Sequence, residues 1–586
     1  MKQRGRARPP GALAASGAGL RPGLPAAQFC TSPRLSIDSA SDPYAPRPGF
    51  AQRHAELLAA AVVFVATVFL TVVSFPPYKV PEAAYAMLVP GIFWAYTRPR
   101  FRLYATTLIA AQALAWTLLL GWLHHVTWVG LMLLGPFVGM WVGSWFLAAW
   151  WVLSRIVGKA IPIRLAVVLG LAGVWVLIEW SRTWLLGGFP WLPLAASQWE
   201  RASILQIAAY TGAYGISFVL VMMNLGFGAY AHRLFREGVS GINKRSQEFF
   251  LALFLLLACV CVHFQESFNR RGYAVPLARI ALVQPKIPQT VKWDPSEARS
   301  ILEVLAKTTL EAAASHPDLI VWPEAVTPLA VRGDETVKAF VESLVKQTKV
   351  PLLLGSIAVE NPRTDSETWY NGAFMVTPED GVASGYYAKR RLVPFGEFMP
   401  LRPLLGWIGK FVPIGGDFMA GETSAPLLVS LRGQSIVFGP LICYEDTYPD
   451  LARFSAQSGA EVLTVLTNNG WFGEGGAAYQ HAAHAVLRAV ETRRPVLRCG
   501  NAGWSGWIDE FGSVRATLTN EEGTIYYRGT RVIDVSRDAR WVDRNSFFVE
   551  YGNWFVLVCA TLAAFAVAIL KMGEVPAKPP GDVEPG

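Results

Sequence analysis

The sequence predicts an α-helical membrane bundle joined to a layered α/β domain, and three observations support this fold class. Of the 586 residues, 52% are hydrophobic and 16% are charged, whereas a soluble chain carries about 25% charged residues. Long apolar stretches fill the first half of the chain and recur near its end. Between them, strand-like segments alternate with helical ones, which is typical of a layered α/β domain.

Eight apolar stretches approach the length of about 20 residues that a membrane-spanning helix needs. The second stretch is marginal because Pro90 interrupts it. The stretches lie near 57–75, 82–97, 103–123, 128–153, 165–181, 205–229, 248–264 and 554–570. We therefore expect about eight transmembrane helices, by length and composition.

Basic residues fall on every second loop between these stretches. Lysine and arginine precede the first stretch and follow the second, fourth and sixth, whereas the loop 121–127 has neither. Because cytoplasmic loops are enriched in Lys and Arg, this alternation predicts a cytoplasmic N-terminus. It also places 265–553 on the outer side of the membrane and the C-terminal tail inside.

The domain boundaries follow from these patterns. The first 55 residues are poor in acids and rich in Ala, Pro, Gly and Arg, which favours a disordered cytoplasmic tail. An organelle transit peptide or an over-extended start of the reading frame remains an alternative. We expect a tail over 1–55, a membrane domain with seven helices over 56–264, an α/β domain over 272–550, a closing helix over 553–571 and a cytoplasmic tail over 572–586.

Composition also excludes some classes of function. The net charge of +9 is interpreted as a topology signal, since no aromatic-interleaved basic patch indicates nucleic-acid binding. The six cysteines form neither a disulfide framework nor a zinc motif. His481 and His484 have a spacing compatible with a metal, but without an evident third ligand a structural role is favoured. We therefore expect no metal and no cofactor.

Two segments have both a functional and a structural interpretation. Glu179 and Arg182 are spaced so that they can pair on one helix face. A charged residue at membrane depth is a candidate functional residue. A structural ion pair that fixes helix packing is the slightly favoured interpretation. The segment 184–191 combines Gly, Pro and Trp and suits a loop at the outer interface. The segment 401–412 has one apolar helical face, which fits either a membrane-facing lid or core packing.

In the α/β domain, three reactive side chains stand at or just after strand-like segments. Cys443 ends the apolar run 436–443, which is typical of a buried strand. A buried cysteine is most often a small hydrophobic residue, and a disulfide half is a further alternative. With Glu324 and Lys389, however, the thiol forms a set that can catalyse acyl transfer. Glu324 would be the base, while Lys389 and the backbone N–H of Tyr444 would stabilise the oxyanion.

The motifs WPE (322–324), YAKRRLVPFGE (387–397) and CYE (443–445) resemble those of the nitrilase, or carbon–nitrogen hydrolase, superfamily. With the membrane stretches, the resemblance narrows to the apolipoprotein N-acyltransferase family and covers about residues 55–570. It implies an αββα sandwich and a catalytic triad of Glu324, Lys389 and Cys443. It also implies supporting or substrate-handling roles for Glu397, Tyr444, Glu445, Trp293 and Asn371.

The resemblance further implies a reaction. An acyl chain would pass from a membrane phospholipid, through a thioester on Cys443, to the N-terminal amine of diacylglyceryl-cysteine in an apolipoprotein. The expected partners are a phospholipid donor, a diacylglyceryl-prolipoprotein acceptor and the membrane, with no nucleic acid. We expect a monomer in the cell inner membrane with its catalytic domain in the periplasm. A membrane-anchored amidase that uses water as acceptor stays open, as does a non-catalytic scaffold or transporter.

Some positions depart from the family pattern. The chain has Asn469 where the family commonly has Asp, and it has a second thiol, Cys499, where a small residue without a thiol is usual. Neither position is a member of the predicted triad. Whether Cys499 lies near Cys443 is open at this point.

Overall fold

The computed structural model describes residues 50–237, 246–270, 272–399 and 417–572. The chain divides into two compact units, 1–55 and 56–586. Of the first unit, only the start of helix α1 (Phe50–Val73) is described. The expected disordered tail and the apolar segment 401–412 therefore lie largely or wholly outside the described residues.

Within the described residues, six helices are long and apolar enough to cross a membrane. They coincide with six of the eight expected stretches, so the prediction of a multi-pass membrane protein is confirmed. The spans are Arg53–Val73, Trp128–Ile156, Ile161–Ser181, Ala213–Arg236, Gln247–Asn269 and Trp554–Met572. They belong to α1, α4 (Trp128–Gly143) with α5 (Trp145–Ile156), α6 (Ile161–Ser181), α9 (Ala213–Glu237), α10 (Gln247–Asn269) and α17 (Trp554–Met572).

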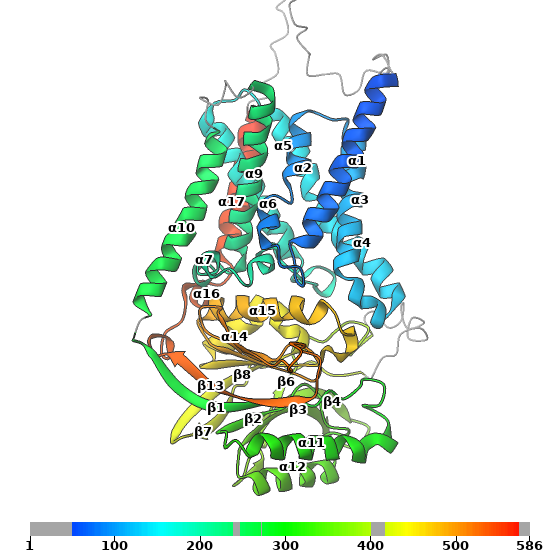
Figure 1. Cartoon of the computed structure of the whole chain (residues 1–586), viewed down its shortest axis with the longest axis vertical. Coiled ribbons are helices and arrows are strands. Elements are labelled where there is room, and N and C mark those ends of the chain that lie inside the picture. The colour runs from blue at the N-terminus through cyan, green and yellow to red at the C-terminus, as the bar shows by residue number, and fades with distance from the viewer. Residues whose placement is uncertain (1–49, 238–245, 271, 400–416, 573–586) are drawn as a thin grey trace, which may run out of the picture. The chain divides into compact units, whose positions relative to one another are not determined.

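The other two expected stretches differ from a regular span. The stretch 82–97 forms a 3-10 turn and the eight-residue helix α2 (Val89–Tyr96). Proline stands at the start of both pieces, where it has no N–H to continue a preceding helix. The stretch 103–123 forms α3 (Phe101–Leu119), which packs along α4. Helix α2 runs towards the end of the bundle that lies away from the α/β domain, and α3 runs back towards that domain (Figure 1).

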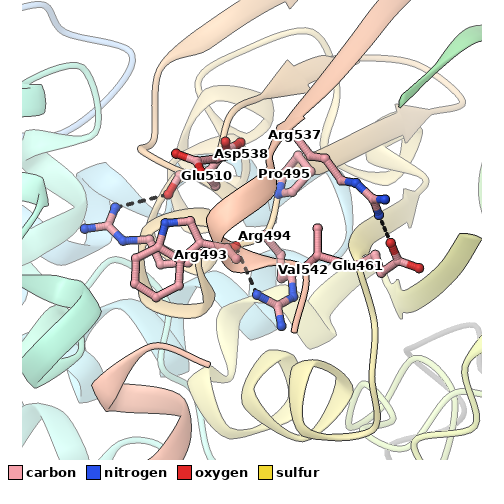
Figure 2. A pocket seen from close by; sticks show the side chains of 9 residues that line it. Glu461, Arg493, Arg494, Pro495, Glu510, Arg537, Asp538 and Val542 are labelled. Atoms are coloured by element: carbon pink, nitrogen blue, oxygen red, sulfur yellow. Dashed lines mark hydrogen bonds and ion pairs between the residues drawn. The ribbon is translucent and has the colours of Figure 1, made fainter. Parts of the chain in front are cut away.

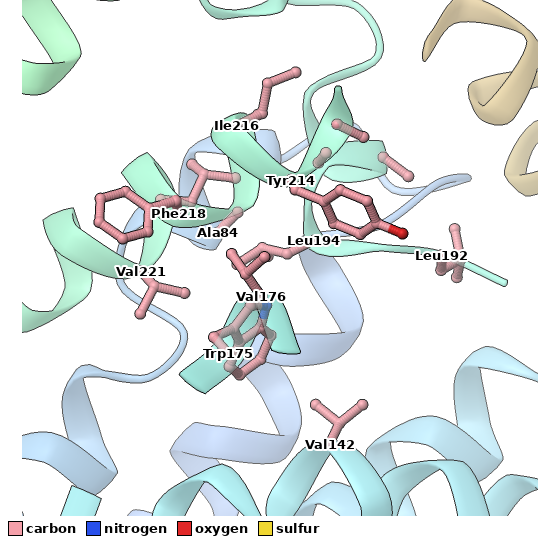
Figure 3. Close-up of a cluster of buried hydrophobic side chains, with 14 of the residues drawn as sticks. Ala84, Val142, Trp175, Val176, Leu192, Leu194, Tyr214, Ile216, Phe218 and Val221 are labelled. Carbon is pink, nitrogen blue, oxygen red and sulfur yellow. The ribbon is translucent and has the colours of Figure 1, made fainter. Parts of the chain in front are cut away.

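Close helix contacts in this bundle depend on small residues. A Cβ atom on Gly170 or Gly173 of α6 would lie 2.7 or 2.6 Å from a backbone oxygen of α17. Such approaches between helices are typical of membrane proteins. Figure 3 shows the buried centre of the bundle, where Trp175 and Val176 of α6 meet Leu194 and Tyr214.

Basic loops gather at one end of the helices, away from the α/β domain (Figure 1). The guanidinium of Arg98 donates to the carbonyl of Ser154 at 3.0 Å. Glu248 at the start of α10 forms ion pairs with Arg164 at 2.9 Å and with Arg233 at 3.6 Å. The loops after the second, fourth and sixth apolar stretches therefore lie together.

The α/β domain consists of two mixed sheets. The first has the order β13-β1-β2-β3-β4-β5, with β6 paired to β4, and the second has the order β12-β11-β10-β9-β8-β7. The strands of the first sheet are β1 (Ala274–Gln284), β2 (Leu319–Val321), β3 (Leu352–Glu360), β4 (Thr368–Thr377), β5 (Gly381–Val382), β6 (Tyr387–Ala388) and β13 (Gly529–Asp538). Those of the second are β7 (Leu427–Leu431), β8 (Gln434–Ile442), β9 (Val462–Thr467), β10 (Val496–Gly500), β11 (Gly506–Ile508) and β12 (Val514–Thr517).

Helices cover the outer faces of both sheets, which confirms the predicted α/β sandwich. Helices α11 (Ala298–Ala313) and α12 (Glu335–Thr348) pack on the first sheet, while α14 (Pro449–Gln457) and α15 (Ala477–Thr492) pack on the second (Figure 1). Apolar side chains such as Leu353 and Phe438 fill the space between the sheets. The strands β1–β2–β3 and β8–β9–β10 are parallel, so their carboxyl ends form a common edge in each sheet.

Helix α15 joins the two halves of the molecule. Every residue of α15 except Tyr479 is buried, because the sheet lies on one side of the helix and the membrane helices on the other. Gln480 donates to the carbonyls of Pro76 at 3.2 Å and Leu119 at 3.0 Å. At the other end of α15, Glu491 accepts a hydrogen bond from the amide of Ala213 at 2.7 Å.

Candidate active site

The three predicted reactive residues stand at strand ends of both sheets. Glu324 follows β2 and Lys389 follows β6 in the first sheet, whereas Cys443 follows β8 in the second. All three side chains are buried. The Cys443 thiol interacts electrostatically with both Glu324 and Lys389, so residues far apart in sequence form one group.

A buried hydrogen-bonded cluster surrounds Lys389. Its ammonium lies 3.1 Å from Oε1 of Glu324 and 2.9 Å from Oε1 of Glu397. The side-chain amide of Asn371, on β4, donates to the same two oxygens at 2.9 and 3.0 Å. Asn371 and Lys389 therefore hold both carboxylates in place with charge-assisted hydrogen bonds.

Backbone geometry fixes the two glutamates. A Cβ on Gly355 of β3 would lie 2.7 Å from the Cα of Glu324, so only glycine lets the chain pass this close. The second carboxylate oxygen of Glu397 accepts a hydrogen bond from the amide of Val393 at 2.9 Å.

Neighbouring charges determine the protonation state of the Glu324 carboxylate. Burial raises the pKa of Glu324, but the ammonium groups of Lys389 and Lys292 and hydrogen bonds from Lys389 and Asn371 outweigh burial and hold the pKa below its usual range. Burial lowers the pKa of Lys389, yet the charges of Glu324 and Glu397 raise it well above its ordinary value. Glu324 is thus a carboxylate and Lys389 an ammonium at neutral pH.

Cys443 is held as a neutral thiol in a strained position. Its φ of 51° lies in the left-handed region, which costs a residue with a Cβ about 1–2 kcal/mol. Burial and the charge of Glu324 raise the pKa of the thiol, Lys389 lowers it, and the net pKa is about 12. A base must therefore remove the proton as the sulfur reacts.

Glu445 joins the segment around Cys443 to the segment that carries Lys389. One carboxylate oxygen accepts from the amides of Arg390 at 2.6 Å and Arg391 at 3.1 Å. The other accepts from the amide of Ile442 and the hydroxyl of Tyr387, both at 2.7 Å. Glu445 thus positions residues on both sides of the site.

Tyr444 connects the site to the membrane domain. Its hydroxyl and that of Tyr448 each donate to the carbonyl of Gly188 at 3.1 Å. Gly188 has a φ of 85°, and a Cβ there would lie 2.5 Å from the carbonyl oxygen of Thr183. The loop 184–191 therefore supports the segment that follows Cys443.

Glu179 and Arg182 stabilise that loop. Glu179 accepts from the indole of Trp175 at 2.8 Å and the amide of Leu194 at 2.6 Å. Arg182 donates to the carbonyls of Phe189 and Trp191. These hydrogen bonds favour the structural interpretation of the two charges: Arg182 binds the loop itself, and Glu179 binds the residue Leu194 just after it.

His481 contacts the backbone of Cys443. Its Nε2 lies 3.1 Å from the carbonyl oxygen of Cys443 and 2.9 Å from Oδ1 of Asp446, and its Nδ1 lies 3.2 Å from Oδ1 of Asn469. Asp446 also pairs with the buried Arg498. Both ring nitrogens thus meet protein groups, in agreement with the structural role favoured from the sequence.

Lys292 belongs to the site and was not identified from the sequence. Its buried ammonium donates to the backbone carbonyl of Glu324 at 3.3 Å and interacts electrostatically with Cys443. Burial lowers the pKa of Lys292 to about 8. A lysine in a polar turn carries no sequence signal for burial, so only its neighbour Trp293 was identified, and 45% of that indole is exposed.

Cys499 does not share the environment of Cys443. Its thiol lies between the sheets and donates to the carbonyls of Val283 and Val321, both at 3.3 Å. Burial raises its pKa. Cys499 is therefore an inert core residue.

A separate pocket on the α/β domain contains none of the predicted site residues (Figure 2). In it, Arg537 pairs with Glu461, and Arg493 donates to the carbonyl of Glu510 at 3.2 Å. Arginines and carboxylates alternate around this pocket. It is lined by Glu461, Arg493, Arg494, Pro495, Glu510, Arg537, Asp538, Trp541 and Val542.

The sandwich and its buried Glu–Lys–Cys group define a nitrilase-like enzyme carried on a multi-pass membrane domain. A carbon-nitrogen hydrolase family model matches residues 279–536, and a model of the apolipoprotein N-acyltransferase N-terminal domain matches 68–226. The chain belongs to the apolipoprotein N-acyltransferase family.

Named relatives agree with this assignment. The apolipoprotein N-acyltransferase of Geobacter metallireducens is 32% identical over 405 residues, which covers 68% of this chain and 73% of the relative. That of Brucella melitensis is 29% identical over 539 residues, or 83% and 95% of the two chains. Among solved structures, an amidase from Nesterenkonia sp. matches with 18% identity and a TM-score of 0.34, over 46% of this chain and 94% of its own. The chain is therefore an acyltransferase of the nitrilase superfamily.

Proposed function

We propose that the chain moves an acyl chain from a membrane phospholipid to the N-terminal amine of diacylglyceryl-cysteine in an apolipoprotein, through a thioester on Cys443. The observation that supports this most is the buried group in which Lys389 bridges Glu324 and Glu397 and interacts with Cys443. Family membership supplies the class of donor and acceptor.

In the first half-reaction, Glu324 takes the proton of the Cys443 thiol as the sulfur attacks the ester carbonyl carbon of the phospholipid. The carbon–sulfur bond forms and the carbonyl oxygen becomes an oxyanion. Lys389 and the backbone N–H of Tyr444, in the first turn of a 3-10 helix (Cys443–Thr447), stabilise this charge. The oxyanion then collapses, the ester carbon–oxygen bond breaks, and the lysophospholipid leaves with the proton from Glu324.

In the second half-reaction, the acceptor amine attacks the thioester carbonyl. Glu324 takes a proton from the amine as the nitrogen–carbon bond forms. The carbon–sulfur bond breaks, and the thiolate receives the proton. One covalent intermediate shared by two substrates predicts ping-pong kinetics.

We place the catalytic domain on the periplasmic side of the inner membrane. The clustering of basic loops at the other end of the helices supports this orientation, because such loops stay in the cytoplasm. Residues 272–550 form the proposed catalytic unit. One chain contains all the residues that the scheme uses, which favours a monomer.

Exposed apolar side chains accompany the site and suit a lipid substrate. Trp293, Leu329, Trp369 and Met419 are each 43–49% exposed. Contiguous apolar patches at a surface mark lipid, ligand or partner contacts. We propose that they contact the acyl chains of donor or acceptor.

A test of this function separates transfer from hydrolysis. Purified enzyme is supplied with radiolabelled phosphatidylethanolamine, with or without a diacylated lipopeptide that has a free N-terminal amine. The proposal predicts a triacylated peptide and little free fatty acid. Multiple-turnover release of free fatty acid that the peptide does not suppress would instead establish the amidase alternative.

A further inference from the structure

Lys292 is a buried cation without a carboxylate in contact. Among the described residues, no Asp or Glu oxygen lies within 4.0 Å of its ammonium, and its one hydrogen bond goes to the backbone carbonyl of Glu324. Only 2% of the residue is exposed. A buried charge without a carboxylate in direct contact is costly; here the charge of Glu324 and the ring of Trp293, 5.4 Å from the ammonium, offset that cost only in part, since the pKa of Lys292 stays below its usual value.

The turn that carries Lys292 is held firmly by the second sheet. Asn501, just after β10, accepts from the amide of Ile287 at 2.9 Å and donates to its carbonyl at 2.8 Å. Asn468, just after β9, donates to the side chain of Gln289 at 2.7 Å. These contacts place the lysine next to the strand ends that carry the triad.

The surroundings of Lys292 are those of the reaction centre. Glu324 after β2, Lys389 after β6 and Cys443 after β8 all interact electrostatically with it, and Glu397 lies beyond Lys389. An ammonium has three N–H donors; one of them makes a hydrogen bond here, and the ring of Trp293 lies 5.4 Å from the nitrogen. The remaining donors are available to a substrate oxygen.

We infer that Lys292 is a second cationic catalytic residue, which donates a hydrogen bond to the oxyanion that forms when Cys443 attacks the acyl carbonyl. This inference rests on the proposed function. Lys292 keeps its proton throughout, so it adds no proton transfer to either half-reaction. Its role is to stabilise charge that Lys389, already bound to two carboxylates, stabilises only in part.

The inference predicts an alkaline limit on acylation. Burial lowers the pKa of Lys292 to about 8, so the ammonium is present below this pH and is lost above it. The pKa of Glu324 lies below its usual range, that of Lys389 well above, and that of Cys443 at about 12. None of these three groups titrates between pH 7 and 9.

The test compares Lys292→Met, which keeps the length without the charge, with Lys292→Arg, which keeps the charge at every pH used. Single-turnover formation of the Cys443 thioester from phosphatidylethanolamine is followed by intact mass between pH 6 and 10. Lys307→Met, on the exposed face of α11, is the matched control. We expect Lys292→Met to be about 100-fold slower than wild type at pH 7, as for loss of one oxyanion donor.

The pH profiles decide between a catalytic and a structural role. The wild-type rate falls above pH 8 and approaches that of Lys292→Met, whereas Lys292→Arg shows no such fall. A wild-type rate in Lys292→Met, or the same alkaline fall in wild type and Lys292→Arg, would overturn the inference. Absence of any thioester in the wild type would instead refute the proposed function itself.

Discussion

Glu445 binds the backbone amide of Arg390 at 2.6 Å, so the residue two positions after the nucleophile fixes the residue next to Lys389. The same carboxylate also binds the amide of Ile442, the residue before the nucleophile. Cys443 and Lys389 come from different sheets, and Glu445 sets their relative position.

Replacement of Glu445 by Gln tests this link. The Glu445 carboxylate is the acceptor in all four of its hydrogen bonds. The NH₂ group of a glutamine would therefore face other donors and leave buried N–H or O–H groups unpaired. We expect a loss of stability of about 1–3 kcal/mol and thioester formation at least about 10-fold slower, because positioning is lost. Single-turnover acylation and thermal unfolding measure these effects.

The control is Glu379→Gln, at an exposed site. It should change neither quantity. A Glu445→Gln enzyme that acylates at the wild-type rate would contradict the positioning role.

Two adjacent glycines offer a matched test of how the membrane loop supports the site. Gly187 and Gly188 have φ of 89° and 85°, but a Cβ on Gly187 meets nothing within 4 Å, whereas one on Gly188 meets the carbonyl of Thr183 at 2.5 Å. Gly187→Ala should cost about 1–2 kcal/mol from backbone strain alone. Gly188→Ala should cost more and should also slow acylation, since Tyr444 binds the Gly188 carbonyl. Equal effects of the two substitutions on acylation would argue against support of the nucleophile by this loop.

Glu324 gives a pH dependence of stability with a defined sign. Two lysines hold its pKa in the folded protein below the unfolded value of about 4.3. Its contribution to stability is therefore present above that value and is lost as the pH falls through the lowered folded pKa. We expect the difference in melting temperature between wild type and Glu324→Gln to shrink between pH 5 and pH 3. A difference that does not change with pH would show that the lysines do not stabilise this carboxylate.

Glu324→Gln should also abolish thioester formation, because the amide cannot accept the thiol proton. The measurement is intact mass after incubation with phospholipid. Wild-type acylation by this variant would remove Glu324 from the role of base.

The proposed orientation is tested by labelling in cells. We introduce a single cysteine at the exposed Glu379 of the α/β domain, or at Arg100 in the basic loop before α3, in a background where Cys443 is retained. A membrane-impermeant maleimide should label the first position from the periplasm and the second only after lysis. The reverse pattern would invert the topology.

Sequence patterns were sufficient to predict those parts of the fold that depend on local hydrophobic patterning. Apolar runs and alternation of strands with helices identified the membrane bundle and the sandwich, because hydrophobic burial decides both. The buried run ending at Cys443 marked a strand end for the same reason. The resemblance added Asn371 and Glu397, whose contacts with Glu324 and Lys389 are long-range and leave no local pattern.

The features that were missed depend on tertiary contacts. The stretch 82–97 is apolar enough for a span, but prolines at the starts of its two pieces limit it to short helices. Lys292 stands in a polar turn, and it is buried because the folded chain brings it against Glu324, which is distant in sequence. Helix α15 has the composition of an ordinary helix, yet all of its residues except Tyr479 are buried because the membrane domain covers its outer face.

The most direct test of the account is the intact mass of the purified protein after incubation with phosphatidylethanolamine, beside Cys443→Ala. We predict that the wild type gains the mass of one acyl chain, that neutral hydroxylamine removes it, and that the variant gains nothing. A diacylated lipopeptide added afterwards should discharge the adduct and appear as the triacylated product. An adduct that forms equally on Cys443→Ala, or one that the lipopeptide cannot discharge, would contradict a thioester on Cys443 as the intermediate.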